Sequence, residues 1–168
     1  MCKLGVRSFA VFWDDLWNDD GTHGDEQAEL MNYIAAELRK EYPDVKPLTI
    51  CPTQYNRGWA NAIYLPALGD IMDSDINIMW TGNTVVHCID KEGTDWVNER
   101  IERKAYIWWN FPVTDFVRDH ITLAPTYGND LDIADKLSGF VSNPMEHAEA
   151  SKIALYGVAD YTWNMKAY

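Results

Sequence analysis

The sequence predicts an α/β protein with a parallel sheet, and two observations support this fold class. Strand-like apolar runs and helical patterns alternate about five times along the 168 residues, at the spacing of about thirty residues that is typical of βαβ units. The first apolar run, at 9–13, is unbroken, which is typical of a strand buried on both faces of a parallel sheet. No linker or internal repeat interrupts the pattern, so residues 1–168 are expected to form a single domain.

Each strand is predicted from a short apolar run that stops at polar residues. The five expected strands are 9–13, 48–51, 76–80, 105–110 and 140–144. The last strand is expected to begin only after Ser138 and Gly139, which we interpret as the end of a short helix.

Helical patterns follow the predicted strands. The five expected helices are 25–41, 64–72, 94–103, 132–137 and 146–158. The apolar face of the first helix is predicted to consist of Leu30, Met31, Ile34 and Leu38. Pro66 is compatible with the first turn of its helix, and Thr94 is expected to be an N-cap.

The acidic, glycine-containing loop at 16–24 invites a calcium interpretation. An EF-hand register anchored on Gly21 would place Leu16 and Gln27 at positions that need oxygen ligands, so the pattern fails. We therefore interpret these acids as part of a solvated loop.

Charge and hydropathy exclude several classes of partner. The net charge is −12, which argues against binding to nucleic acids or anionic membranes and favours a neutral or cationic ligand. No apolar run approaches the roughly 18 residues of a membrane span. Residues 1–5 lack the apolar stretch of a signal peptide, so no export signal is visible and the compartment stays open.

The three cysteines, Cys2, Cys51 and Cys88, are widely spaced. They form neither a metal-binding pattern nor a disulfide framework, so we expect free thiols, with Cys51 and Cys88 buried. No metal ion or other cofactor is expected.

Aromatic residues are abundant, with eight Trp and nine Tyr. Aromatic rings pack well against the C–H faces of sugars and equally well in a protein core. For Trp80 and Trp109 we keep the core interpretation.

Polar residues end the predicted strands. They are Asp14 and Asp15, Tyr55, Thr81, Asn110 with the nearby Asp115, and Asn143. Because the carboxyl ends of parallel strands lie at one edge of the sheet, these side chains are expected to converge there. Such a set suits a polar, uncharged ligand with many hydroxyl groups.

Asp14 and Asp15 allow two interpretations. Paired carboxylates are typical of acid/base chemistry at a glycosidic bond. Neighbouring strand residues point to opposite sides, so the two cannot have the same role. Two consecutive residues would suit substrate-assisted catalysis, in which the sugar supplies its own nucleophile. In the alternative, Asp15 caps the following segment and Asp14 faces water.

Several motifs in the same order resemble glycoside hydrolase family 84, the β-N-acetylglucosaminidases that include bacterial hyaluronidase-like toxins and the eukaryotic O-GlcNAc hydrolase. The motifs are Phe-Trp-Asp-Asp at 12–15, Trp-Thr-Gly at 80–82 followed by Val85, Trp-Trp-Asn-Phe-Pro-Val-Thr-Asp at 108–115, Ser-Asn-Pro-Met at 142–145, Ser-Lys-Ile-Ala at 151–154 and Ala-Asp-Tyr-Thr-Trp-Asn at 159–164. The resemblance covers nearly the whole chain.

The resemblance implies that Asp14 orients and polarises the 2-acetamido N–H of the substrate, whose carbonyl oxygen then attacks the anomeric carbon to form an oxazoline. Asp15 would be the general acid and then the general base. Tyr55 would hydrogen-bond the acetamido group. Trp108 would pack against its methyl group, and Asn110 would hold its carbonyl or a nearby hydroxyl.

The same resemblance assigns the rest of the pocket. Thr81 and Val85 would line it around the reacting sugar. Asp115 would bind the 4- and 6-hydroxyls, with Asn143 beside it. The implied partner is an N-acetylglucosamine-containing glycan or glycoprotein.

The family's catalytic domain is an eight-stranded barrel, which typically needs about 250 residues. In the family the paired acids follow the fourth strand, so residues 1–168 are expected to be the C-terminal part of a (β/α)8 TIM barrel, strands four to eight. The first three βα units would be absent, together with a glycine and a lysine that help to bind the sugar.

Two hypotheses follow. The chain is a fragment of an enzyme that keeps its acid pair, or it is a weak or inactive half-barrel that acts as a sugar-binding or assembly module. Five strands cannot close the barrel, so inner-facing residues of 9–13 and 76–80 would meet water. A homodimer through the open edges is therefore expected.

Overall fold

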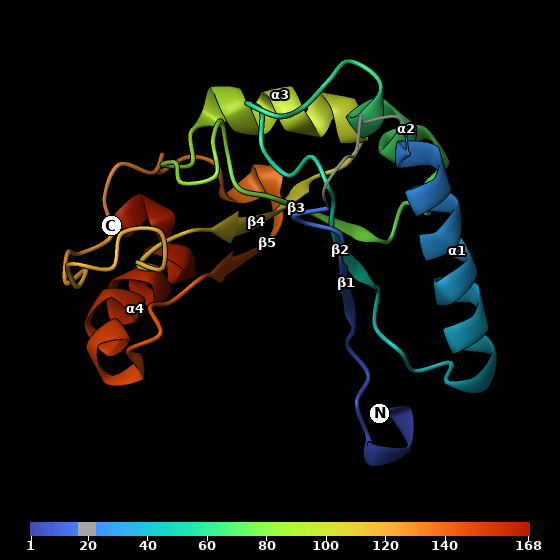
Figure 1. Cartoon of the computed structure of the whole chain (residues 1–168), viewed down its shortest axis with the longest axis horizontal. Helices are drawn as coiled ribbons and strands as arrows, with labels where there is room; N and C mark the ends of the chain where they lie inside the picture. The colour runs from blue at the N-terminus through green and yellow to red at the C-terminus, as the bar shows by residue number, and fades with distance from the viewer. Residues whose placement is uncertain (17–22) are drawn as a thin grey trace.

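The computed structural model describes residues 1–16 and 23–168, which form one parallel sheet with helices around it (Figure 1). The strands follow one another in the order β1-β2-β3-β4-β5, and each neighbouring pair is parallel. Their bounds are β1 Ala10–Phe12, β2 Thr49–Cys51, β3 Asn77–Trp80, β4 Ala105–Trp109 and β5 Leu137–Ser142. The predicted α/β fold class with five parallel strands is confirmed.

Four α-helices and three short 3-10 helices complete the described chain. The α-helices are α1 Gly24–Glu41, α2 Tyr64–Ile71, α3 Lys91–Ile101 and α4 Ala148–Trp163. The 3-10 helices are Cys2–Leu4, Ala134–Lys136 and Met165–Ala167. Figure 1 shows α1, α2 and α3 next to one another along the outside of the curved row of strands, and α4 beside β5.

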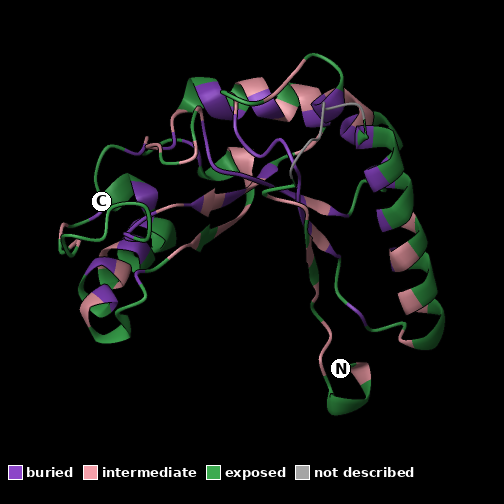
Figure 2. Cartoon of the chain, in the orientation of Figure 1, coloured by how far each residue is buried: buried purple, intermediate pink, exposed green. Residues whose placement is uncertain are grey.

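The main core lies between these helices and the outer face of the sheet. In β4, Ala105, Ile107 and Trp109 are buried while Tyr106 and Trp108 are half-buried, because alternate strand residues point to opposite faces. The outer-face residues meet buried side chains from all four helices. These include Ala28, Met31, Ala35, Tyr64, Leu65, Leu68, Val97, Ile101, Ala154 and Val158. Figure 2 shows buried and exposed residues alternating along α1 and α3, as expected for helices with one face on the sheet.

A second, smaller cluster covers part of the inner face. It consists of Cys51, Tyr55 and Met79, with Val85, Tyr106 and Trp108 packed against them. Ile76, Ile78 and Trp80 are buried in the main core. On the inner face, Met79 is 7% exposed and is covered by aromatic side chains of its neighbours, so the expectation that inner-facing residues of 76–80 would meet water is wrong for Met79.

Burial of the first strand on both faces is also contradicted. Phe12 is 53% exposed, and Val11 is only half-buried. β1 is paired on one side, with β2, and lies at an edge of the sheet. An apolar run has the same appearance at an edge and in the centre of a sheet, so the pattern did not distinguish them.

The start of α3 differs from the prediction. Asp90 is its N-cap, and the Asp90 side chain accepts a hydrogen bond from the Gly93 amide. Thr94, the expected cap, lies within the helix and donates its hydroxyl to the Asp90 carbonyl at 2.7 Å.

The region before β5 also differs. The predicted helix at 132–137 is one 3-10 turn, and Ser138 and Gly139 belong to β5. Gly139 pairs with Tyr106 of β4, and a Cβ atom at Gly139 would lie 2.2 Å from the Tyr106 ring. This glycine therefore permits close packing between strands, where the sequence suggested the end of a helix.

Smaller differences concern single residues. Leu30 is exposed, while Ala28 and Ala35 are buried on the side of α1 that packs against the main core. All three cysteines are free, with Cys51 buried as predicted and Cys88 only half-buried. Trp80 and Trp109 are core residues, as expected.

Most of the acidic loop predicted to be solvated lies outside the described residues. Within the described residues, none of the helices combines the length and the apolar character that crossing a membrane requires.

Candidate active site

A pocket of about 400 Å³ lies at the carboxyl ends of the strands. All the site residues predicted from the sequence line it: Asp14, Asp15, Tyr55, Thr81, Val85, Trp108, Asn110, Asp115 and Asn143. The strands thus bring together side chains that are up to about 130 positions apart in the chain, as expected for a parallel sheet.

Four further lining residues were not predicted: Cys51, Val86, Val113 and Phe116. Val86 and Phe116 directly follow Val85 and Asp115, so adjacency on the same loop is the signal that could have identified them. The described lining contains three carboxylates and no basic side chain, which suits a ligand that carries hydroxyl or amide groups without a negative charge.

The two adjacent carboxylates follow β1 directly. The Trp13 amide donates to the Cys51 carbonyl at 2.9 Å and extends the β1–β2 ladder up to the first acid. Asp15 has a left-handed backbone, with φ of 57°, a conformation that costs a non-glycine residue on the order of 1–3 kcal/mol. Asp14 is half-buried and Asp15 is exposed. The N-cap of α1 is His23, so Asp15 does not cap that helix.

Tyr55 connects the ends of β1 and β2. Its hydroxyl donates to Asp15 Oδ1 at 3.3 Å, and its ring packs edge-on against Trp59 with centroids 4.9 Å apart. Burial raises the pKa of the Tyr55 hydroxyl, and the charge of Asp15 and the hydrogen bond to it raise that pKa further. The hydroxyl therefore stays protonated at neutral pH and acts as a donor to the carboxylate.

Cys51 lies beside the same carboxylates. Burial raises the pKa of its thiol, and the charges of Asp14 and Asp15 add to this effect. A thiol in such a setting stays neutral and is a poor nucleophile.

The opposite side of the pocket is built around the Asn110 side chain. Its Nδ2 donates to the Val85 carbonyl at 2.7 Å. Its Oδ1 accepts from Trp108 Nε1 and from Asn143 Nδ2, each at 3.0 Å. Both lone pairs of Oδ1 are then occupied and one N–H remains, so Asn110 can offer a ligand a donor at a fixed position.

Backbone hydrogen bonds fix the exits of β4 and β5 relative to each other. The Asn143 amide donates to the Trp109 carbonyl at 2.9 Å, and the Val113 amide donates to the Asn143 carbonyl at 3.0 Å. Asp115, two residues beyond Val113, is exposed at the pocket.

Thr81 and Trp108 complete the wall. The Thr81 hydroxyl donates to the Thr84 carbonyl at 3.0 Å, so it is engaged within the protein. The Trp108 ring packs edge-on against Phe12, with centroids 5.4 Å apart. Among the described residues, no group of three or more His, Cys, Asp or Glu side chains is arranged to hold a metal ion.

The family model described as beta-N-acetylglucosaminidase matches residues 1–168. The chain belongs to this family. The resemblance to glycoside hydrolase family 84 and the partial TIM barrel are thereby confirmed.

Relatives with known names agree with this assignment. Protein O-GlcNAcase of Rattus norvegicus and of Mus musculus are each 27% identical to the chain over 171 residues, which cover 96% of this chain and 18% of either relative. The chain thus spans less than a fifth of the length of these curated relatives.

Solved structures agree as well. The structure of CpGH84B is 37% identical, with a TM-score of 0.91, over 99% of this chain and 30% of that one. An O-GlcNAc hydrolase mutant from Thermobaculum terrenum is 26% identical, with a TM-score of 0.89, over 99% of this chain and 38% of that one.

Proposed function

We propose that the pocket binds a β-linked N-acetylglucosamine and hydrolyses its glycosidic bond with retention of configuration. The observation that carries this proposal is the pair of consecutive carboxylates, Asp14 and Asp15, which line one pocket with the other strand-end residues. Family membership supports the sugar, and the relatives named O-GlcNAcase suggest glycoproteins as its carriers.

The spacing of the acids favours a substrate-assisted route. Ordinary retaining glycosidases place two carboxylates about 5–5.5 Å apart on opposite sides of the scissile bond. Two consecutive residues at the end of one strand approach the bond from a single side. The 2-acetamido group of the substrate then takes the place of the missing nucleophile.

In the first step, Asp14 accepts a hydrogen bond from the acetamido N–H, and the acetamido carbonyl oxygen attacks the anomeric carbon. The glycosidic bond breaks, and Asp15 protonates the departing oxygen. In the second step, Asp15 removes a proton from water, which opens the oxazoline and restores the acetamido group. Both acids return to their starting protonation states.

The remaining residues position the sugar. Tyr55, whose hydroxyl is held at Asp15 in the free protein, hydrogen-bonds the acetamido group. Trp108 packs against the acetamido methyl group. Asn110 donates its one remaining N–H to the acetamido carbonyl or a nearby hydroxyl oxygen. Asp115 binds the 4- and 6-hydroxyls, with Asn143 beside it, while Thr81 and Val85 form the adjoining wall.

We further propose that residues 1–168 are the C-terminal portion of a barrel and that two copies associate through the open edges. β1 and β5 are the terminal strands of the described sheet, and Phe12 exposes an aromatic ring on the inner face. Exposed edges and apolar patches favour association. Light scattering at micromolar concentration should give a dimer mass, and a stable monomer would contradict this assembly.

The second candidate function is a weak or inactive half-barrel that binds sugar or acts in assembly. It is favoured by the same uncovered edge at β1. It predicts affinity for N-acetylglucosamine without turnover.

The decisive experiment compares hydrolysis of 4-nitrophenyl N-acetyl-β-glucosaminide and 4-nitrophenyl β-glucoside, with the mass determined by gel filtration on the same sample. Substrate-assisted catalysis predicts turnover of the acetamido sugar alone. Comparable turnover of both would refute the substrate-assisted route, and binding of N-acetylglucosamine without hydrolysis would favour the second candidate.

A further inference from the structure

The loop between β3 and α3, residues 82–90, holds the pocket side chain of Asn110 and the core side chain of Trp109 through its backbone carbonyls. The Val85 carbonyl accepts the Asn110 Nδ2 hydrogen bond at 2.7 Å. Two residues later, the His87 carbonyl accepts from Trp109 Nε1 at 2.9 Å. The orientation of the Asn110 amide therefore depends on where this loop lies.

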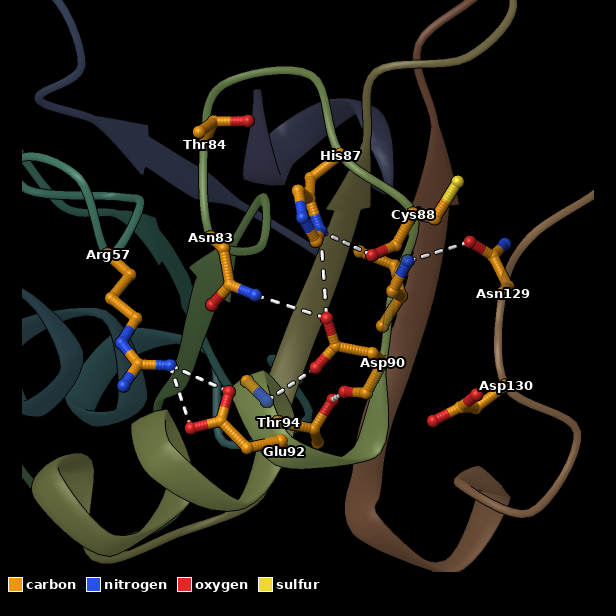
Figure 3. Close-up of polar contacts among 12 residues, drawn as sticks. Arg57, Asn83, Thr84, His87, Cys88, Asp90, Glu92, Thr94, Asn129 and Asp130 are labelled. Atoms are coloured by element: carbon orange, nitrogen blue, oxygen red, sulfur yellow. Dashed lines mark hydrogen bonds and ion pairs between the residues drawn. The ribbon is translucent and has the colours of Figure 1, made fainter.

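Asp90 joins both ends of the loop to α3 (Figure 3). Its Oδ2 accepts from Asn83 Nδ2 at 3.1 Å and lies 3.8 Å from His87 Nδ1. Its Oδ1 accepts from the Gly93 amide at 2.6 Å. One carboxylate thus ties the beginning of the loop, at Asn83, to the first turn of the helix, while His87 Nδ1 is engaged with the Cys88 carbonyl.

The surroundings of Asn83 show that its side chain depends on the hydrogen bond to Asp90. Asn83 Oδ1 is buried and has no hydrogen-bond partner among the described residues, so the Asn83 side chain is held by its donation to Asp90. A Cβ atom at Gly93 would lie 2.9 Å from Asn83 Oδ1 and 3.1 Å from Asp90 Oδ1. The absence of a side chain at Gly93 is what allows the two groups to approach.

We propose that Asp90 is a positioning residue for the pocket. Through Asn83 and the loop, and together with the Thr81 hydroxyl that holds the Thr84 carbonyl, it helps to fix the Val85 carbonyl and hence the direction of the free N–H of Asn110. Asp90 does not line the pocket, so it acts without touching the ligand. The effect on substrate rests on the proposed function, whereas the effect on the loop does not.

A purely structural role of Asp90 as helix cap can be separated from this one. A serine caps a helix nearly as well as an aspartate, but its single oxygen cannot also hold Asn83. Asp90→Ser therefore keeps the cap and removes the tie. Asn83→Ala removes the same tie without touching the Gly93 amide.

The test uses the full chain with Asp90→Ser, Asn83→Ala and the double substitution. Asp95→Asn is the matched control, because Asp95 lies on the same helix and pairs with Lys136 outside the loop. The first measurement is the pair of indole N–H signals of Trp108 and Trp109 in ¹H–¹⁵N spectra. Both tie-breaking variants should shift these signals and speed their hydrogen exchange, while Asp95→Asn should not.

The second measurement is the kinetics on 4-nitrophenyl N-acetyl-β-glucosaminide. Each tie-breaking variant should raise KM about fivefold, the worth of one hydrogen bond, and leave kcat within about twofold. The double variant should be no worse than either single one, because both remove the same link.

Unchanged indole signals, equal shifts in the control, additive effects in the double variant, or a loss confined to kcat would each overturn the inference. If Asp90→Ser does not fold, Asn83→Ala decides. If the unsubstituted chain neither binds nor hydrolyses the sugar, the proposed function fails, and the indole signals still decide the role of Asp90.

Discussion

The two sides of the pocket are built differently. On the side of β1, Asp14 and Asp15 stand at the end of an edge strand, and among the described residues Asp15 has one long hydrogen bond, to Tyr55. On the side of β4 and β5, the Asn110 amide is held by three hydrogen bonds. Groups that transfer protons need free lone pairs, while groups that position a ligand benefit from being fixed. With the function proposed above, the side of β1 is the reactive side and the side of β4 and β5 is the binding side.

Removing the reactive side should have the largest effect. Asp15→Asn should lower kcat on a substrate with a poor leaving group by roughly 10²–10⁴-fold, because the proton donor is lost. A phenol of low pKa can leave without that proton, so the hydrolysis rate of its glycoside should fall less. Hydrolysis rates on an alkyl and a 4-nitrophenyl glycoside provide the measurement.

Asp70→Asn is the matched control, since Asp70 is exposed on α2 and does not line the pocket. An equal loss on both substrates for Asp15→Asn would count against its role as acid and base.

Disturbing the binding side should have a smaller effect of a different kind. Asn143→Ala removes one of the two donors to Asn110 Oδ1, so KM should rise about fivefold to tenfold while kcat changes little. Steady-state kinetics on the 4-nitrophenyl substrate would show the split. Asn164→Ala, which removes an exposed amide away from the pocket, should leave both constants unchanged. A fall in kcat with constant KM would mean that the two sides are not separate.

The smallest effect concerns stability at alkaline pH. Ordinary pKa values are 9.0 for the Cys51 thiol and 10.0 for the Tyr55 hydroxyl, and both pKa values are raised in the folded protein. The unfolded chain loses these protons first, so above about pH 9 it binds fewer protons than the folded chain, and the free energy of unfolding falls as pH rises.

Urea unfolding at about pH 8 and about pH 10.5 measures this slope. Tyr55→Phe should reduce it, and Tyr33→Phe on the exposed face of α1 should not. If Tyr55→Phe does not change how the free energy of unfolding varies with pH, the reactive side is not the source of that pH dependence.

The position of these pocket residues at the carboxyl ends of the strands was predictable from the sequence because each strand is a short apolar run that ends in a polar residue. Asp14, Tyr55, Thr81, Asn110 and Asn143 all follow this rule, and a parallel sheet brings such ends together. Their convergence in one pocket follows from topology alone, without any knowledge of packing.

The predictions that failed concern residues whose local structure depends on tertiary packing. Thr94 and Asp90 are both good helix caps by type, and the choice depends on the loop that Asp90 holds. Gly139 resembles a helix end until the Tyr106 ring is placed against it. Phe12 is exposed because β1 has one neighbour, a fact that an apolar run does not encode.

The left-handed backbone at Asp15 has a consequence for how this site can be lost. Glycine adopts that conformation without steric cost, so Asp15→Gly would relieve strain of about 1 kcal/mol or more at the turn while it removes the acid. A variant of this chain that lacks the Asp15 carboxylate would then gain stability at this turn. With the proposed role of Asp15, the residue that favours folding at this position differs from the residue that catalysis needs, so selection for folding alone would favour replacement of the aspartate.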